Sequence, residues 1–210
     1  KGVALSHKNI MANVEAVSSV ISITSTDTML STLPLSHMFE QTAGLFTPLY
    51  RGGRIIYITS LKPSALFGAL KNEKITIILT VPRLLQSIRK SILAKAAEGG
   101  KSRIFSRLLA FGARHSWLSP LLFHQVHTRF GTKFRFFVSG GASLDHDTEK
   151  FWRTLGFNIL QGYGLTECAP VLTVNPEKSP RIGTVGRTLP NVEIRIAKDG
   201  EILAKGSNIF

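Results

Sequence analysis

Residues 136–142 read Phe136-Phe137-Val138-Ser139-Gly140-Gly141-Ala142, a short apolar run that leads directly into a pair of glycines. An apolar run without alternating polar positions is typical of a strand that is covered on both faces, as in a parallel sheet. Glycines at the end of such a strand let a ligand approach the backbone, because no Cβ stands in the way. In open α/β sheets, ligands bind beyond the carboxyl ends of the strands. The segment therefore predicts an α/β fold with a ligand site at this turn.

A second segment of the same kind follows further along the chain, Ile159-Leu160-Gln161-Gly162-Tyr163-Gly164-Leu165-Thr166-Glu167. We expect a strand from Asn158 to Leu160 and a second glycine turn after it. Tyr163 offers an aromatic face for a base, Thr166 a hydroxyl for a phosphate oxygen, and Glu167 a carboxylate for Mg²⁺. These groups fit a Mg²⁺–nucleotide site, and because parallel strands end at one edge of a sheet, we expect Gly141 and Tyr163 to share one cleft. The alternative is that both glycine segments are tight turns that serve the fold alone.

Strands and helices alternate along the rest of the chain, as in α/β proteins. The expected strands are 29–35, 54–58, 76–81 and 134–138, and the expected helices are 9–23, 41–50, 65–71, 82–130 with a break at Gly99-Gly100, and 145–155 with Asp145 as its N-cap. Near the end, Val192, Ile194 and Ile196 alternate with polar residues, and Asp199-Gly200 favours a two-residue type I′ turn. We therefore predict layered sheets with flanking helices over residues 1–183, and the start of a small β subdomain over residues 184–210.

The composition is that of a folded protein, with 43% hydrophobic and 19% charged residues in a chain of 210, and this argues against disorder. No apolar run approaches the ~20 residues that a transmembrane helix needs. Cys168 is the single cysteine, so an intrachain disulfide is excluded. A lone cysteine favours a reducing compartment, and we expect a cytoplasmic protein in which Cys168 is a small buried residue without a catalytic role.

The formal net charge is +13, and eleven basic residues but one acid lie between Arg83 and Arg135. A field of this sign attracts polyanions: nucleotides, nucleic acid or anionic lipid. Within the segment Arg103–Phe123, we expect the apolar residues Ile104, Phe105, Leu108, Leu109 and Phe111 to lie opposite Arg103, Arg107 and Arg114 on one helix. Such a helix can lie on an anionic membrane surface, which would give a peripheral contact on the inner face of a membrane. A domain helix with a solvated basic face is the favoured interpretation.

Several blocks of the sequence resemble one known family. The run Gly162–Glu167 resembles the Y-G-x-T-E motif of the adenylate-forming superfamily, which includes acyl- and aryl-CoA synthetases, luciferases and the adenylation domains of peptide synthetases. Pro34–Glu40 resembles the family's preceding motif in the version common among long-chain fatty acid enzymes. Further matches are Lys1-Gly2, which looks like the end of the family's phosphate loop, Ser139–Ala142, and Gly183–Arg187.

The resemblance implies ATP-dependent activation of a long-chain fatty acid as an acyl-adenylate, followed by transfer to CoA. Glu167 would then ligate Mg²⁺, Thr166 would bond the α-phosphate, and Tyr163 would lie against the adenine of ATP or AMP. The backbone of Gly140, Gly141 and Ala142 would line the adenine and acyl pocket, and His37 would orient the carboxylate. The family's nucleotide-binding set also includes the positions of Lys1, Gln161, Gly162 and Gly164.

Alternatives accompany these assignments. His37 could be a hydrogen-bonded core histidine, and Glu167 could favour the start of a short helix through its dipole. The acceptor could be an acyl carrier protein instead of CoA. A basic nucleic-acid-binding module ranks last, because it leaves the glycine segments unexplained. By resemblance, the phosphate loop lies before Lys1 and the small C-terminal domain after Phe210, so we expect this 210-residue chain to be inactive by itself.

Overall fold

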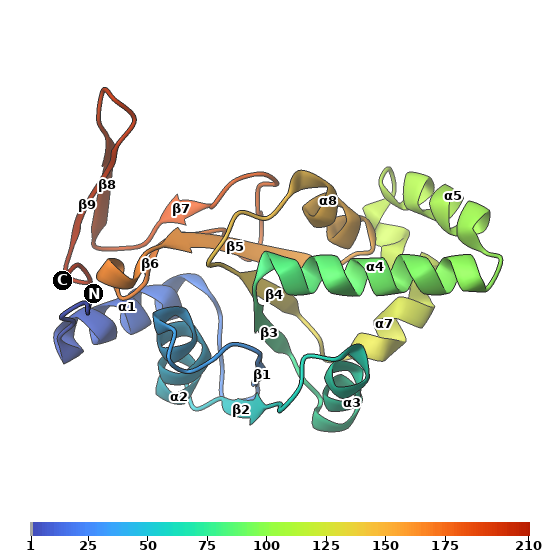
Figure 1. Cartoon of the computed structure of the whole chain (residues 1–210), viewed down its shortest axis with the longest axis horizontal. Helices are drawn as coiled ribbons and strands as arrows, with labels where there is room; N and C mark the ends of the chain where they lie inside the picture. The colour runs from blue at the N-terminus through green and yellow to red at the C-terminus, as the bar shows by residue number, and fades with distance from the viewer. Residues whose placement is uncertain (1) are drawn as a thin grey trace.

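The computed structural model describes residues 2–210, and its centre is one seven-stranded sheet (Figure 1). The strand order is β2-β1-β3-β4-β5-β6-β7. The first five strands run parallel, β6 is antiparallel to β5, and β7 is antiparallel to β6. The strands in chain order are β1 Thr28–Ser31, β2 Arg54–Tyr57, β3 Ile77–Thr80, β4 Phe136–Ser139, β5 Asn158–Gly164, β6 Val171–Val174 and β7 Arg187–Thr188. The predicted α/β class is confirmed.

Helices cover both faces of the sheet. They are α1 His7–Val20, α2 Thr47–Tyr50, α3 Pro63–Glu73, α4 Pro82–Glu98, α5 Ser102–Gly112, α6 Ser119–Leu122, α7 His124–Phe130 and α8 His146–Thr154. Successive residues of a strand point to opposite faces. Phe137 accordingly packs in a core with α3, α4, α7 and α8, while its neighbours Phe136 and Val138 pack in a second core beneath α1. This explains why the strand that precedes Gly140 needs apolar residues at every position.

The expected helical region 82–130 is divided more finely than predicted. The break at Gly99-Gly100 is confirmed, because α4 ends at Glu98 and α5 begins at Ser102. A 3₁₀ turn over Ser116–Leu118 and the short helices α6 and α7 follow. The expected helix 41–50 also begins differently, as a π-helix over Glu40–Phe46 that continues into α2.

The second glycine turn was a wrong prediction, because β5 continues through both glycines to Gly164. Gly162 and Gly164 pair with the antiparallel strand β6. A Cβ at Gly162 would lie 3.0 Å from the backbone oxygen of Thr173, and a Cβ at Gly164 would overlap the backbone oxygen of Pro170. These glycines therefore permit close approach of two backbones, and a turn is not their role.

The last part of the chain forms a hairpin of β8 Val192–Ile196 and β9 Ile202–Gly206, a separate two-stranded sheet. Its turn is not the expected type I′. The amide of Ala197 donates to the oxygen of Glu201 (2.8 Å) and only Gly200 has a positive φ (+91°) in the loop, so three residues connect the strands. Strand β7 still pairs with β6 in the large sheet. The division of the chain at residue 184 stays a prediction.

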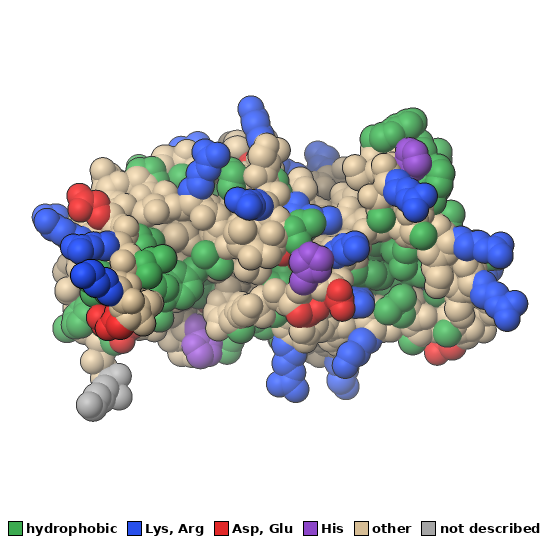
Figure 2. Space-filling view, turned by 90° about the horizontal axis from the view of Figure 1, so that it is seen from above, with side chains coloured by type: hydrophobic (Ala, Val, Ile, Leu, Met, Phe, Trp, Pro, Cys, Tyr) green, Lys and Arg blue, Asp and Glu red, His purple; other side chains and the backbone are tan. Residues whose placement is uncertain are grey.

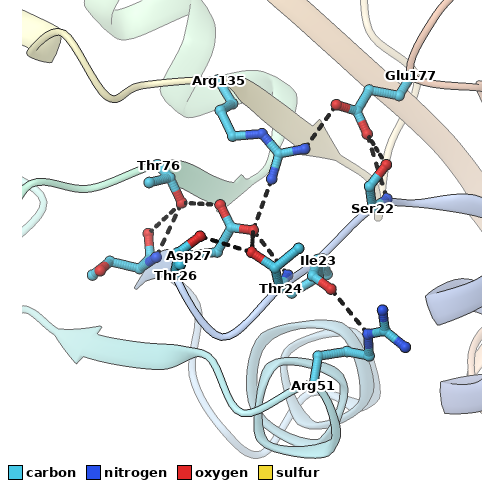
Figure 3. Close-up of polar contacts among 10 residues, drawn as sticks. Ser22, Ile23, Thr24, Thr26, Asp27, Arg51, Thr76, Arg135 and Glu177 are labelled. Atoms are coloured by element: carbon cyan, nitrogen blue, oxygen red, sulfur yellow. Dashed lines mark hydrogen bonds and ion pairs between the residues drawn. The ribbon is translucent and has the colours of Figure 1, made fainter.

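A polar cluster fastens the amino-terminal edge of the sheet (Figure 3). Arg135, which precedes β4, donates to Asp27 (2.7 Å) and to Glu177 (2.8 Å). Asp27, which precedes β1, also accepts from the hydroxyl of Thr76 at 2.7 Å. Burial raises the pKa of Asp27, but the Thr76 hydrogen bond and the Arg135 guanidinium outweigh it and hold the pKa below its usual value. The cluster links β1, β3 and β4 at the edge of the sheet opposite to Gly140 and Gly141, which follow β4.

Candidate functional site

A cavity of about 490 Å³ lies where β1, β3 and β4 end and along β5. The glycine junction after β4 contributes Gly140 and Gly141, and β5 contributes Gly162, Tyr163 and Gly164. Thr166 and Glu167 follow β5, and His37 belongs to the loop after β1. Residues from three separate parts of the chain thus meet in one cavity, and the expected convergence of Gly141 and Tyr163 is confirmed.

Glycine is required at the two positions after β4 for different physical reasons. Gly141 has a φ of +78°, a left-handed conformation that favours glycine. Gly140 is buried beneath the ring of Phe39, and a Cβ there would lie 2.8 Å from the Cζ atom of that ring. Both glycines line the cavity, but the Phe39 ring covers the backbone at Gly140.

Glu167 is held in a three-residue 3₁₀ helix, Thr166–Cys168, directly after β5. Its side chain is half-buried, lines the cavity and makes no hydrogen bond or ion pair within residues 2–210. A helix of three residues aligns few peptide dipoles, so the stabilisation of a helix start explains little of this position. The carboxylate is accordingly available to a ligand.

The described residues offer no preformed metal site, because no group of three or more His, Cys, Asp or Glu side chains comes together in them. Mg²⁺ in nucleotide sites is held by one or two carboxylates together with phosphate oxygens and water. Glu167 fits this mode, because it is a single hard ligand on the cavity wall beside the Thr166 hydroxyl. Mg²⁺ would therefore arrive with the nucleotide.

His37 is exposed at the mouth of the same cavity. Its ring makes no hydrogen bond within the described part of the chain, and only its backbone is bonded, to Pro34 (3.0 Å) and from Gln41 (3.0 Å). The alternative of a hydrogen-bonded core histidine is therefore wrong. Its ring is free to contact a ligand.

The buried side chains that line the cavity are apolar. They come from α1 and the segment after it, from the π-helix and from the sheet: Val17, Ile21, Ile23, Met29, Ala43, Leu79, Val138, Val171 and Val174. The polar lining residues Tyr163, Thr166, Glu167 and His37 are less buried, so the cavity combines hydrocarbon with polar groups and suits an amphipathic ligand.

Three predicted residues do not line the cavity. Ala142 is exposed beyond it. Gln161 is buried, with its amide nitrogen 3.5 Å from the oxygen of Thr184. Lys1 lies outside the described residues. Their assignment to nucleotide binding stays a prediction.

Two asparagines that the sequence reading missed hold the segment after β5 in place. The side chain of Asn13, on the buried face of α1, donates to the oxygen of Val171 (2.7 Å) and accepts from its amide (3.2 Å). The side chain of Asn208 donates to the oxygen of Cys168 at 2.8 Å. Both are almost fully buried. A polar residue on an apolar helix face was the available signal for Asn13, whereas Asn208 had none.

Cys168 itself is buried, as expected. Burial, together with the nearby Glu167 carboxylate, raises the pKa of the Cys168 thiol. A thiol in this environment is a poor nucleophile. Its surroundings are consistent with a packing role.

Fold and cavity together define an α/β domain with a cavity at the carboxyl edge of a mostly parallel sheet, the place where such sheets bind ligands. The model of the family described as AMP-binding enzyme matches residues 1–210. The chain belongs to this family.

The comparisons with individual proteins agree with the family. The chain is 34% identical over 233 residues to long-chain-fatty-acid–CoA ligase 4 of Saccharomyces cerevisiae, covering 100% of this chain and 33% of the yeast protein. It is 30% identical over 243 residues to long chain acyl-CoA synthetase 4 of Arabidopsis thaliana, covering 100% of this chain and 36% of the plant protein. The chain spans about a third of the length of the curated relatives it matches.

Solved structures share the fold. The N-terminal domain of FACL13 from Mycobacterium tuberculosis superposes with a TM-score of 0.75 at 20% identity, covering 100% of this chain and 48% of that one. MatB from Rhodopseudomonas palustris superposes with a TM-score of 0.73 at 26% identity, covering 100% of this chain and 37% of that one. The expected resemblance to adenylate-forming enzymes is confirmed.

Proposed function

We propose that the protein containing this chain activates a long-chain fatty acid with ATP as an acyl-adenylate and then transfers the acyl group to CoA. One observation carries the proposal: a single cavity is lined both by Tyr163, Thr166 and Glu167 and by buried apolar side chains. An acyl-adenylate likewise combines a polar nucleotide with a hydrocarbon chain. The names of the relatives support the substrate class.

Each polar group has a distinct task in this proposal. Tyr163 stacks on the adenine, and Gly141 lets the base approach the backbone. The Thr166 hydroxyl donates to an α-phosphate oxygen, where charge builds up when the fatty acid carboxylate attacks. Glu167 holds Mg²⁺, which neutralises phosphate charge when bound. His37 orients the attacking carboxylate at the cavity mouth.

Pyrophosphate exchange tests the proposal in the longer protein that contains this chain. We expect exchange of labelled pyrophosphate into ATP that depends on added fatty acid and increases with its chain length up to the long-chain range. Exchange that no carboxylate stimulates contradicts the enzymatic assignment. Exchange with short acids alone contradicts the proposed substrate class.

The acceptor is tested separately. Thioester formation with CoA supports the proposal, and thioester formation with acyl carrier protein alone would transfer the function to the alternative class of synthetase. We also propose that the 210-residue chain binds the acyl-adenylate without catalysing its formation. A hydrolysis-resistant acyl-sulfamoyl adenosine, titrated calorimetrically, measures that binding. Pyrophosphate exchange by the 210-residue chain above the level of its Glu167→Ala variant would contradict the proposal that this chain does not catalyse formation of the adenylate.

A further inference from the structure

The region from Lys101 to Phe123 presents apolar and basic side chains together on the surface. No acid occurs between Glu98 and Asp145. Figure 2 shows green hydrophobic and blue basic side chains next to each other at the end of the molecule that α4 and α5 form. This end lies far along the molecule from the hairpin β8–β9 (Figure 1).

Helix α5 differs from the predicted arrangement in which all its apolar residues share one face. Phe105, Leu108 and Leu109 pack against the core. Ile104 and Phe111, by contrast, are 58% and 45% exposed. They lie seven residues apart, two turns along one face, and helical spacing places Arg107 on that same face, between them. The prediction was wrong for these two residues because the core accepts only a narrow stripe of the helix.

The segment after α5 adds two larger exposed groups. Trp117 is 77% exposed in the 3₁₀ turn, and Leu121 is 74% exposed in α6. The ring of His115 stacks on Phe111 with centroids 4.4 Å apart, and α5 contacts both the 3₁₀ turn and α6, so the exposed groups of the two segments lie in neighbouring parts of the surface. An exposed tryptophan next to leucine is unusual on a surface that contacts only water, but common at membrane–water interfaces.

The basic residues around these groups are available to a partner. Lys101, Arg103, Arg107 and Arg114 are all exposed, and none forms an ion pair within residues 2–210. Their charge selects an anionic partner. The apolar side chains between them select a partner that can also accept hydrocarbon, which favours a lipid surface over the nucleic acid backbone.

We propose that this surface, Lys101–Leu121, docks the protein peripherally on anionic lipid bilayers, with Trp117, Leu121, Ile104 and Phe111 inserted among the acyl chains and the arginines on the headgroups. Insertion is shallow, because no helix among residues 2–210 has the length and apolar character needed to cross a bilayer. The proposal goes beyond the proposed function and does not depend on it, since docking needs neither ATP nor CoA.

Sedimentation with vesicles tests the proposal on the 210-residue chain. We expect the chain to partition onto vesicles of phosphatidylcholine with phosphatidylglycerol, and far less onto phosphatidylcholine alone. Arg103→Gln, Arg107→Gln and Arg114→Gln together should weaken partitioning about a hundredfold, because each charge near an anionic surface contributes about fivefold. Trp117→Ser with Leu121→Ser should weaken it on the order of tenfold or more through lost apolar burial.

Matched controls come from the hairpin. Arg195→Gln, Lys198→Gln and Lys205→Gln remove the same charge from exposed positions on or beside β8–β9 and should leave partitioning within about twofold of the original chain. Ile196→Ser removes a side chain that is 70% exposed and should have equally little effect. If the three substitutions at the hairpin weakened partitioning as much as Arg103→Gln, Arg107→Gln and Arg114→Gln together, the proposal would be overturned, because net charge alone would then explain binding.

Tryptophan emission gives an independent readout. The chain has two tryptophans, and Trp152 has no exposed surface. A blue shift on adding anionic vesicles therefore reports Trp117, and Trp117→Phe should abolish the shift while most binding remains. An unshifted spectrum with bound vesicles would overturn insertion. The chain could instead bind a DNA or RNA oligonucleotide more tightly than vesicles, with no loss of that binding on the three hairpin substitutions. That result would overturn the proposal and make nucleic acid the partner of this surface.

Discussion

Glu40 should make the protein less stable as the pH rises, and Glu40→Gln should remove this dependence. Glu40 begins the π-helix and has no exposed surface. Neither of its carboxylate oxygens has a hydrogen-bond partner of normal geometry within the described residues. Burial raises the pKa of Glu40 to about 7, and the nearby Ser31 hydroxyl and Leu33 amide lower it only in part.

The size of the effect follows from the two pKa values. In the unfolded chain the carboxyl has its ordinary pKa of 4.5, against about 7 in the folded protein. Below pH 4.5 it is protonated in both states and costs nothing. Between the two values the unfolded chain loses the proton first, so stability falls as the pH rises. The loss reaches roughly 3 kcal/mol and levels off above the folded pKa.

Urea unfolding at a series of pH values, followed by tryptophan fluorescence, measures this effect. The stability gain from Glu40→Gln should be near zero at pH 4.5, grow as the pH rises, and reach roughly 3 kcal/mol above pH 8, because glutamine carries no charge to bury. Glu193→Gln, at an exposed position on β8, is the matched control and should leave the pH profile unchanged. A gain from Glu40→Gln that is the same at every pH would refute a buried titrating carboxyl.

Three further predictions concern the site and its support. Glu167→Ala in the longer enzyme should remove most pyrophosphate exchange while circular dichroism stays native, and full turnover at limiting Mg²⁺ would exclude its role as a metal ligand. Gly164→Ala should prevent native pairing of β5 with β6, because a Cβ there overlaps a backbone oxygen, whereas Gly68→Ala in α3 has open space and should be neutral or stabilising by about 0.5–1 kcal/mol; equal melting temperatures would contradict the close approach. Arg135→Met should cost about 3 kcal/mol at pH 7 by leaving the buried Asp27 carboxylate without its cationic partner, and because the pKa of Asp27 is lowered in the folded state, this cost should shrink as the pH falls through that pKa.

The sequence predicted the middle of the sheet well because burial on both faces demands unbroken apolar runs. Strands β3 and β4 follow from such runs, and the N-cap of α8 follows from Asp145, whose side chain accepts from the amide of Thr148 at 2.8 Å. The meeting of Gly141 with Tyr163 followed from the rule that parallel strands end at one edge. Local chemistry and a general rule of sheet geometry were sufficient for these features.

Features that depend on contacts between distant residues could not be predicted. Gly164 lets the backbone of β5 approach the backbone that leads into β6. A glycine in the sequence does not by itself show whether it serves such an approach or a turn. The hydrogen bonds of Asn13 and Asn208 join positions 158 and 40 residues apart. The exposed side of α5 depends on how narrow a stripe the core accepts. Each of these is a property of the packed molecule.

The fastening of the segment after β5 also couples the cavity to the end of the described chain. The Asn208 side chain donates to the Cys168 oxygen (2.8 Å), and the Phe210 amide donates to the Glu167 oxygen (3.0 Å). The backbone that carries the proposed metal ligand is therefore anchored by residues forty or more positions further along the chain. A substitution beyond the β8–β9 hairpin can thus displace the Glu167 carboxylate without altering any residue that lines the cavity.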